Sequence, residues 1–411
     1  MAGLTAEQIL VIKSTVPVLE QYGNQITHGF YDGLFRDYPS SFEIFSVTDF
    51  KTDRQPRALA GAVVAVAKNI DNLGALSGAI ATITNKHASL GVVPEQYDLV
   101  LDLLLKELRE VLGDAWTSEI DDAWSTALRI VADALIATEK GLYQSTNGWT
   151  TWKELLVADK KQESDEVVSL YLKTIDGSAL PPFKPGQYVS LQVKVPGQEY
   201  SSARQYSLSD KPSPDYYRIS IRREIGQSDL TAPGSAPGVL SNFIHDSIKV
   251  GDKLKVSHPF GAFHLDSVSA NTPLVFVGAG VGLTPLVSIL NAVLESPQER
   301  QIHFIHGSRS ASARPFADDL IALANSNPNL KLTFYESKDA NQHPYENAKI
   351  TVKSGHIDLK ALSAEELFLG DKNTDYYVIG PTQFLAEKME ELKVLGVELD
   401  KIHSEAFGPG S

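Results

Sequence analysis

Hydrophobic positions follow a helical spacing from the N-terminus to about residue 147. Apolar side chains recur every three or four residues, as in the stripes that contain Leu104 and Leu128. Thr5 and Gln8 have the spacing of a capping box at the start of the first helix. No alternating, strand-like run interrupts this pattern. The sequence therefore predicts an all-α domain over residues 1–147, with about six to eight helices.

The spacing changes to short alternating runs after residue 150. They are separated by turns rich in Pro and Gly, such as PPFKPG at 181–186. The runs are VVSLYLKTI (167–175), QYVSLQVKV (187–195), YYRISIRRE (216–224) and DKLKVSHPF (252–260). This pattern is typical of an antiparallel barrel or sandwich, and we expect an antiparallel β-barrel domain over 150–266. A Gly/Pro/Ser-rich stretch at 226–238 reads as a long surface loop.

Continuous apolar runs alternate with helix-like segments from Thr272 onward. The runs are PLVFVGAG (273–280), QIHFIHGS (301–308), KLTFYES (331–337) and YYVIG (376–380). Strands that are apolar on both faces and alternate with helices predict a parallel sheet covered by helices. We expect an α/β Rossmann-like nucleotide-binding domain over 270–411, so that the whole chain is a multi-domain protein.

The composition narrows the classes of function. The chain of 411 residues has a net charge of −14 and no basic run, which argues against nucleic acid as a partner. No window approaches the roughly 18 apolar residues of a membrane helix, and the N-terminus lacks the features of a signal peptide. We therefore expect a cytoplasmic protein with no obligatory membrane. The absence of cysteine excludes disulfides, iron–sulfur clusters and thiolate-bound haem.

A glycine-rich segment links the first buried run of the C-terminal part to a helix. Gly278, Gly280 and Gly282 precede Thr284-Pro285, where the helix is expected to begin. Glycines allow the backbone to approach a pyrophosphate, and a helix N-terminus provides N–H donors. A purely structural strand-to-helix turn has the same appearance, so the motif alone does not decide.

The middle part contains groups that suit a flavin. In RQYSLSD (204–210), Arg204 provides a cation, Tyr206 an aromatic face and Ser207 a hydroxyl. Gly238 and Ser241 stand at a predicted helix start, which is a second place for phosphate oxygens. Each of these motifs can equally be ordinary sheet or loop surface.

The order of these motifs, ending in EAFGP (405–409), resembles the ferredoxin–NADP⁺ reductase-like flavin reductases over about 155–411. The resemblance implies FAD on the barrel and NADH or NADPH at the glycine-rich turn. It implies FAD contacts from Tyr188, Arg204, Gln205, Tyr206, Ser207, Gly238, Ser241, Ala406, Phe407, Gly408 and Pro409. The implied nucleotide contacts are Gly280, Val281, Gly282, Leu283, Thr284 and Pro285. Many relatives carry a cysteine where this chain has Ile379, so no role of that thiol transfers.

The choice between NADH and NADPH stays open at this point. Ser308, Arg309 and Arg314 follow the second buried run, where the adenosine ribose is expected. They can clamp a 2′-phosphate, or they can be solvated loop residues.

One histidine lies within a helical pattern of the N-terminal part. Leu76, Ile80, Ile83 and Leu90 share a helix face with His87, which predicts that His87 points into the domain interior. Glu139 falls on the apolar stripe of the last helix, where a carboxylate needs a partner. With no cysteine available, a haem bound by His87 and supported by Tyr97 and Glu139 is the economical hypothesis. The alternatives are a core histidine, a core tyrosine and a surface glutamate.

HGFYDGLF (28–35), NKH (85–87) and PEQY (94–97) resemble the globin domain of flavohaemoglobins, and this resemblance spans the whole chain. It implies haem b with His87 as iron ligand, and Tyr97 and Glu139 as catalytic residues on the same side. On the other side it implies Tyr31 and Gln55 as catalytic residues, with Phe45 and Leu59 lining the pocket. It also implies that Lys86 and Glu405 tune the coupling between haem and flavin.

The resemblance implies nitric oxide dioxygenase activity. Hydride from NADH or NADPH reduces FAD, single electrons pass to haem, and O₂ bound there oxidises NO to nitrate. Three alternatives remain: an oxygen store or sensor, a reductase of alkyl hydroperoxides or quinones, and a flavin reductase with a helical domain that holds no haem. The small-molecule partners are therefore NO and O₂, and we expect a monomer.

Overall fold

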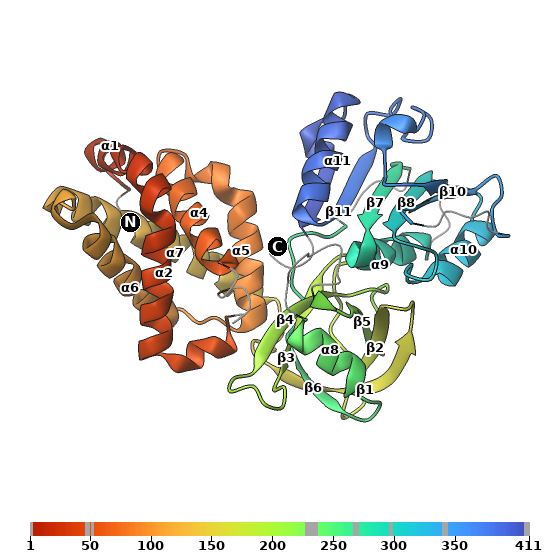
Figure 1. Cartoon of the computed structure of the whole chain (residues 1–411), viewed down its shortest axis with the longest axis horizontal. Coiled ribbons are helices and arrows are strands. Elements are labelled where there is room, and N and C mark those ends of the chain that lie inside the picture. Colours follow the sequence, from red (N-terminus) through yellow and green to blue (C-terminus); the bar gives the residue numbers. More distant parts are fainter. Residues whose placement is uncertain are drawn as a thin grey trace.

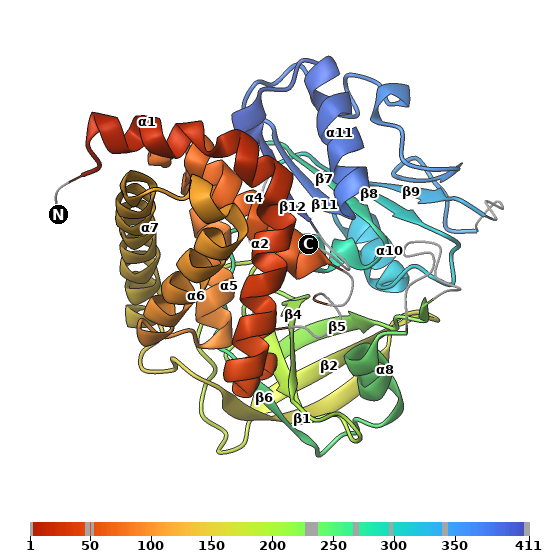
Figure 2. The same ribbon diagram turned by 60° about the vertical axis from the view of Figure 1, so that its left-hand side comes forward.

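The computed structural model describes residues 3–45, 50, 53–226, 237–265, 271–295, 299–338 and 344–406. Figures 1 and 2 show a helical part, an antiparallel sheet and a parallel sheet that follow one another along the chain. Each sheet contains six strands. The three kinds of architecture expected from the sequence are confirmed. None of the helices in these ranges is both long and apolar enough to cross a membrane.

The N-terminal part consists of helices around one apolar core. Its α-helices are α1 (Ala6–Ser14), α2 (Val16–Asp37), α4 (Arg54–Lys68), α5 (Ser77–Leu90), α6 (Glu95–Leu112) and α7 (Ser118–Gln144), and its 3-10 helices are η1 (Pro39–Glu43), η2 (Leu73–Leu76) and η3 (Gly113–Ala115). Thr5 caps α1 in the predicted capping box with Gln8. Phe30, Leu108 and Trp124 are fully buried where α2, α6 and α7 meet.

Helix α5 contacts two parts of the molecule. His87, on its predicted inward face, meets Tyr97 and Glu139 of the helical part. The buried residues of α5 are Thr84, Asn85, Ala88 and Ser89. Asn85 and Ser89 are buried because their side chains meet the antiparallel sheet. The sequence pattern of one helix could not show this second neighbour.

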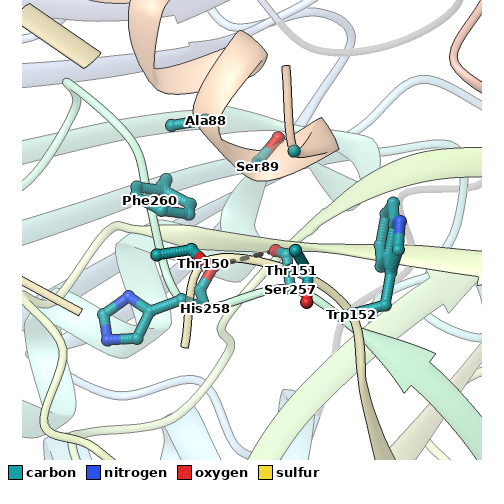
Figure 3. A pocket seen from close by; sticks show the side chains of 9 residues that line it. Ala88, Ser89, Thr150, Thr151, Trp152, Ser257, His258 and Phe260 are labelled. Atoms are coloured by element: carbon teal, nitrogen blue, oxygen red, sulfur yellow. Dashed lines mark hydrogen bonds between the residues drawn. The ribbon is translucent and has the colours of Figure 1, made fainter. Parts of the chain in front are cut away.

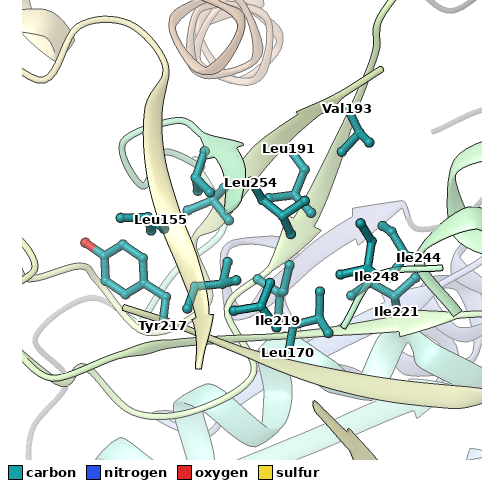
Figure 4. Packing of buried hydrophobic residues seen from close by; sticks show 14 of the residues in the cluster. Leu155, Leu170, Leu191, Val193, Tyr217, Ile219, Ile221, Ile244, Ile248 and Leu254 are labelled. Carbon is teal, nitrogen blue, oxygen red and sulfur yellow. The ribbon is translucent and has the colours of Figure 1, made fainter. Parts of the chain in front are cut away.

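The middle part is a barrel-like antiparallel sheet. Its strands are β1 (Lys153–Gln162), β2 (Val167–Thr174), β3 (Tyr188–Val193), β4 (Ser202–Ser207), β5 (Tyr217–Arg222) and β6 (Lys253–Val256), in the order β4-β3-β6-β1-β2-β5. A bridge between Leu208 and Ile219 joins the two edges, so that the sheet curls back on itself. Leu170, Leu191, Ile219 and Leu254 fill its interior (Figure 4). Helix α8 (Val239–Asp246) adds Leu240 and Ile244 to this core.

The C-terminal part is a parallel sheet covered by helices on both faces. Its strands are β7 (Leu274–Ala279), β8 (Ile302–Ser308), β9 (Leu330–Glu336), β10 (Ile350–Ser354), β11 (Asp375–Gly380) and β12 (Ile402–Ala406), in the order β10-β9-β8-β7-β11-β12. The helices are α9 (Leu283–Leu294), α10 (Ala317–Ser326) and α11 (Thr382–Val394), with 3-10 helices η5 (Gly280–Gly282), η6 (Leu359–Ala361) and η7 (Leu399–Lys401). Helices α9 and α10 pack on one face and α11 on the other. Strands β7 and β11 are parallel neighbours, so their carboxyl ends lie side by side next to the glycine-rich turn. This end of the sheet faces the barrel (Figure 1).

Candidate functional site

Three helices bring His87, Tyr97 and Glu139 together. His87 lies on α5, Tyr97 in the first turn of α6 and Glu139 on α7. His87 Nδ1 is 2.8 Å from the Tyr97 hydroxyl and 2.9 Å from Glu139 Oε1. The Tyr97 hydroxyl donates a hydrogen bond to the same carboxylate oxygen. The cluster expected from the sequence is thus formed by direct contacts.

The surroundings of His87 suit a histidine that binds a metal. Glu139 is only 2% exposed, so its carboxylate depends on the donors around it. Burial and the neighbouring Glu139 raise the pKa of Tyr97 well above its usual value, which keeps the hydroxyl protonated as a donor. Both contacts of the imidazole use Nδ1, and no described residue hydrogen-bonds Nε2. A histidine whose Nδ1–H faces a carboxylate has Nε2 free for iron and becomes a stronger electron donor.

A second polar pair lies on α2 and α4. Gln55 Nε2 donates a hydrogen bond of 3.0 Å to the Tyr31 hydroxyl. Burial raises the pKa of Tyr31 to about 12, against the opposing effect of Gln55, so the phenol keeps its proton at neutral pH. Phe45 meets the Tyr31 ring edge-on at 5.4 Å, and Leu59 packs against the same core. Because Gln55 occupies the oxygen as donor, the Tyr31 proton is available for another acceptor.

The expected flavin residues lie on adjacent strands of the barrel. Tyr188 on β3 is paired with Ser207 on β4, and Arg204, Gln205 and Tyr206 precede Ser207 on the same strand. Burial raises the pKa of both Tyr188 and Tyr206, so both phenols are neutral. Because side chains alternate along paired strands, Tyr188, Gln205 and Ser207 lie on one face at this edge of the sheet, and Arg204 and Tyr206 lie on the other.

The expected phosphate position at α8 has the predicted local structure. Gly238 is the N-cap residue of α8, and Ser241 lies in its first turn. A Cβ atom at Gly238 would come within 2.6 Å of Ser241 Oγ, so only glycine fits there. The surface loop expected at 226–238 lies outside the described residues from 227 to 236.

Strand β12 places Glu405 beside the glycine-rich turn. Glu405 is paired with Ile379 on β11, and Ala406 with Gly380. Burial raises the pKa of Glu405 to about 7. The expected flavin contacts Phe407, Gly408 and Pro409 lie outside the described residues. Lys86 is exposed on α5, next to His87.

The glycine-rich turn forms η5 and the start of α9. Gly280 has a φ of +57°, which favours glycine. A Cβ atom at Gly282 would lie 3.1 Å from the carbonyl oxygen of Ile379, so the turn can approach β11 only with glycine. Val281 accepts a hydrogen bond from Thr284 Oγ1, and Leu283 and Pro285 are buried in the first turn of α9. The backbone N–H groups of this helix start suit a pyrophosphate.

Sequence reasoning missed a histidine that holds this turn. His306 at the end of β8 is fully buried, and its Nε2 lies 2.8 Å from the carbonyl oxygen of Gly280. Burial lowers its pKa to about 3, so it is neutral and donates through Nε2. Its position in the apolar run QIHFIHGS was the available signal, because a polar residue at a buried strand position needs a partner.

Arg314 is not placed to clamp a 2′-phosphate. Its side chain is fully buried, and Nη2 is 2.6 Å from the buried Glu336 Oε1. Arg309 forms an ion pair with Glu166 of the barrel, and Ser308 Oγ donates to the carbonyl oxygen of Ser310. Both arginines therefore have carboxylate partners within the chain.

Known families match all three parts of the chain. The Globin family model matches residues 28–135, the Oxidoreductase FAD-binding domain residues 154–265 and the Oxidoreductase NAD-binding domain residues 276–389. The chain is 40% identical over 414 residues to a Flavohemoprotein of Rhizobium meliloti (strain 1021), with 99% of this chain and 98% of that protein covered. It is 38% identical over 410 residues to a Flavohemoprotein of Bacillus subtilis (strain 168), with the same coverage.

Solved structures with the same architecture agree with this result. The flavohemoglobin from Malassezia yamatoensis with bound FAD and heme superimposes with a TM-score of 0.85 at 27% identity, covering 99% of this chain and all of that one. The FAD/NAD binding domain of nitric oxide dioxygenase from Vibrio cholerae O1 biovar El Tor gives a TM-score of 0.55 at 30% identity, over 63% of this chain and all of that one.

Proposed function

Because this chain belongs to the flavohemoprotein family, a group of oxidoreductases with haem, FAD and NAD-binding parts, we propose that it is a nitric oxide dioxygenase. The reaction converts two NO, two O₂ and one NADH or NADPH into two nitrate ions, one oxidised nucleotide and one proton. We assign the haem chemistry to residues 1–147, the flavin to 150–266 and the nucleotide to 270–411.

The observation that carries the proposal is the donor pair Tyr31 and Gln55. A buried phenol with a pKa of about 12 stays protonated, and Gln55 orients it from the oxygen side. Such a preorganised donor stabilises negative charge that develops on a ligand in front of it. In this proposal Tyr31 donates to oxygen in the pocket, and Phe45 and Leu59 exclude water around it.

His87, Tyr97 and Glu139 act on the opposite side. The carboxylate of Glu139 and the hydroxyl of Tyr97 orient the imidazole through Nδ1, and Nε2 would hold the haem iron. Electron donation from such an imidazole would favour chemistry at the O–O bond over reversible oxygen carriage. Haem supplies the iron that binds O₂, and FAD converts the hydride of the nucleotide into single electrons.

The barrel and the parallel sheet bind the two nucleotides. Tyr188, Arg204, Gln205, Tyr206 and Ser207 hold the flavin in this proposal, with Gly238 and Ser241 at its phosphates. The turn from Gly280 to Pro285 holds the pyrophosphate of NADH or NADPH. Lys86 on α5 and Glu405 on β12 tune the coupling between haem and flavin in this proposal.

Replacement of Tyr31 by Phe tests the proposal. We expect nitrate formation to fall by about 10²-fold, since loss of one oriented donor to developing charge has an effect of this size. Reduction of FAD by NADH or NADPH should stay unchanged, because Tyr31 lies in a separate core. Tyr22, an exposed tyrosine of the same helix, gives the control variant Tyr22→Phe. Unaltered nitrate formation in Tyr31→Phe, measured by stopped flow, would reject the assignment.

A further inference from the structure

Helix α5 is hydrogen-bonded to the barrel at two positions that flank His87. Asn85 Oδ1 accepts a hydrogen bond of 2.8 Å from the backbone N–H of Gly261, in the segment after β6. Ser89 Oγ accepts one of 2.8 Å from Ser190 Oγ on β3. Ser89 and Ser190 are at most 1% exposed. Both contacts are therefore shielded from water, where hydrogen bonds hold two elements together most effectively.

The Ser89 contact belongs to a continuous chain of donors and acceptors. Gln205 Nε2 on β4 donates to Ser190 Oγ at 2.9 Å, and Ser190 Oγ donates to Ser89 Oγ. Ser89 Oγ then donates to the carbonyl oxygen of Lys86 at 2.8 Å. The chain thus runs from a strand assigned to the flavin to the residue that precedes His87.

The same interface is supported by neighbouring groups of the barrel. The backbone N–H of Ser190 donates to Ser257 Oγ at 2.9 Å, and Ser257 Oγ donates to the carbonyl oxygen of His258. Figure 3 shows Ala88 and Ser89 above Phe260, Ser257 and His258. Ser190 is therefore held by β6 on one side and presented to α5 on the other.

We propose that Asn85, Ser89 and Ser190 are positioning residues that clamp α5 to the barrel and set the rate of electron transfer from FAD to haem. The inference rests on the cofactor positions of the proposed function. In the step concerned, reduced FAD loses an electron and ferric haem iron gains it, with NADH or NADPH as the source of electrons. No bond forms or breaks at the clamp, which acts only on distance and orientation.

The clamp affects electron transfer because covalently linked domains can move relative to each other. Parts of a chain with separate cores move relative to each other unless their interface restrains them. A buried hydrogen bond contributes roughly 1 kcal/mol, so loss of one shifts an equilibrium between close and separated arrangements about fivefold. Electron transfer occurs from the close arrangement, and its observed rate should fall by up to this factor, the full factor being reached when the close arrangement is the minor one.

The first test uses the holoprotein under anaerobic conditions. NADH or NADPH is mixed with Ser89→Ala, Ser190→Ala and the double variant, and flavin and haem absorbance are followed separately. We expect haem reduction to slow by up to about fivefold relative to each variant's own rate of flavin reduction. The comparison is made within each variant because Ser190 also bonds Gln205 and Ser89 also bonds Tyr188, two residues assigned to the flavin. The double variant should lose less than the sum of the two single effects, because the Ser89–Ser190 bond is shared while each hydroxyl also has a partner of its own. Ser169→Ala, which removes a buried Ser169–Ser220 hydrogen bond of 2.7 Å far from α5, is the matched control.

The second test measures the distance between α5 and the barrel and needs no electron transfer. Since the chain has no cysteine, Thr82→Cys on α5 and Lys173→Cys on β2 are the only sites that a thiol-specific spin label can modify. We expect the distance distribution between the labels to broaden in the Ser89→Ala background and to stay narrow with Ser169→Ala. Asn85 gives a conservative pair, because Asn85→Asp keeps the acceptor for Gly261 N–H and Asn85→Leu removes it.

The outcomes separate the clamp from the proposed reaction. Slower haem reduction and a broadened distribution in Ser89→Ala and Asn85→Leu, with recovery in Asn85→Asp, support the clamp even if the wild type forms no nitrate. A wild type that forms nitrate while both variants keep the haem reduction rate and the narrow distribution overturns the clamp and leaves the proposed function standing.

Discussion

At the scale of single residues, burial sets the protonation state of the candidate catalytic groups. Tyr31 and Tyr97 lie in places where ionisation is unfavourable, so both remain donors near neutral pH. His306 is kept neutral for the same reason. The sequence identified Tyr31 and Tyr97 through their motifs, but their protonation follows from packing among residues distant in the chain.

Glu405 makes a pH-dependent contribution at this scale. Burial raises the pKa of Glu405 from 4.5 to about 7, so the folded chain binds this proton more tightly than the unfolded chain does. Its contribution to stability is present below pH 4.5 and is lost as the pH rises through 7. Between pH 4.5 and 7, the urea midpoint should fall less in Glu405→Gln than in the wild type. The difference corresponds to at most about 3 kcal/mol in the free energy of unfolding.

The control for this titration is Glu398→Gln, since Glu398 is exposed just before β12. Its midpoint should follow the wild-type profile with pH. A Glu405→Gln profile that also matches the wild type would show that Glu405 titrates normally.

At the scale of elements, the turn from β7 into α9 connects sequence pattern and function most directly. The sequence predicted this turn from a buried run, three glycines and the Thr284-Pro285 helix start. The structure adds that β11 and His306 hold it from two sides, through the Ile379 backbone and the Gly280 carbonyl oxygen. Strand β12 was not predicted, because the short segment IHSEA has no clear periodicity and is held by its parallel pairing with β11 and by contacts of Ile402 and His403.

Gly282→Ala tests this turn. The added Cβ atom would lie 3.1 Å from both the Ile379 carbonyl oxygen and Ile379 Cγ2, so the turn must move away from β11. Overpacking of this kind costs about 1–3 kcal/mol, and we expect the KM for NADH or NADPH to rise about tenfold. Initial rates with ferricyanide as acceptor measure this effect without involving haem.

Gly370→Ala is the matched control for that variant, because no atom lies within 4 Å of the Cβ position and the residue is exposed. If Gly282→Ala keeps the KM of the Gly370→Ala protein, close approach of the turn to β11 has no part in nucleotide binding.

At the scale of the whole molecule, separate hydrophobic cores allow the helical part to change without disturbing the sheets. The helices pack around Trp124, the barrel around Leu170 and the parallel sheet around Phe276 and Val378. Two hydrogen bonds from α5 join the helical part to the barrel, and the ring of Phe42 stacks on that of Tyr200.

The separation of the cores predicts the effect of replacing His87 by Ala. We expect the variant to lose haem, since the Nε2 ligand is removed, and to keep FAD and its reduction by NADH or NADPH. Absorbance near 400 nm reports haem content, and ferricyanide reduction reports the flavin reaction. His28→Ala, which removes the other histidine of the helical part, should retain haem. Full haem content in His87→Ala would reject the ligand assignment.

The pattern of residues along the chain was enough to predict the three kinds of architecture and to name candidate residues in the motifs. Periodicity separates amphipathic helices, alternating strands and fully buried strands, because each buries a different set of positions. The cysteine-free composition and the motif order then pointed to haem and flavin. These conclusions depend on the spacing of residues close together in the chain, which can be read without knowing the fold.

Only the tertiary structure decided how these parts meet. The buried pair of Arg314 and Glu336, the His306 contact with Gly280, and the bonds of Asn85 and Ser89 to the barrel join residues far apart in the chain. No periodicity encodes such pairs, because they depend on the packing of several elements at once. For the same reason, the buried face of α5 could be assigned only after its second neighbour, the barrel, was in place.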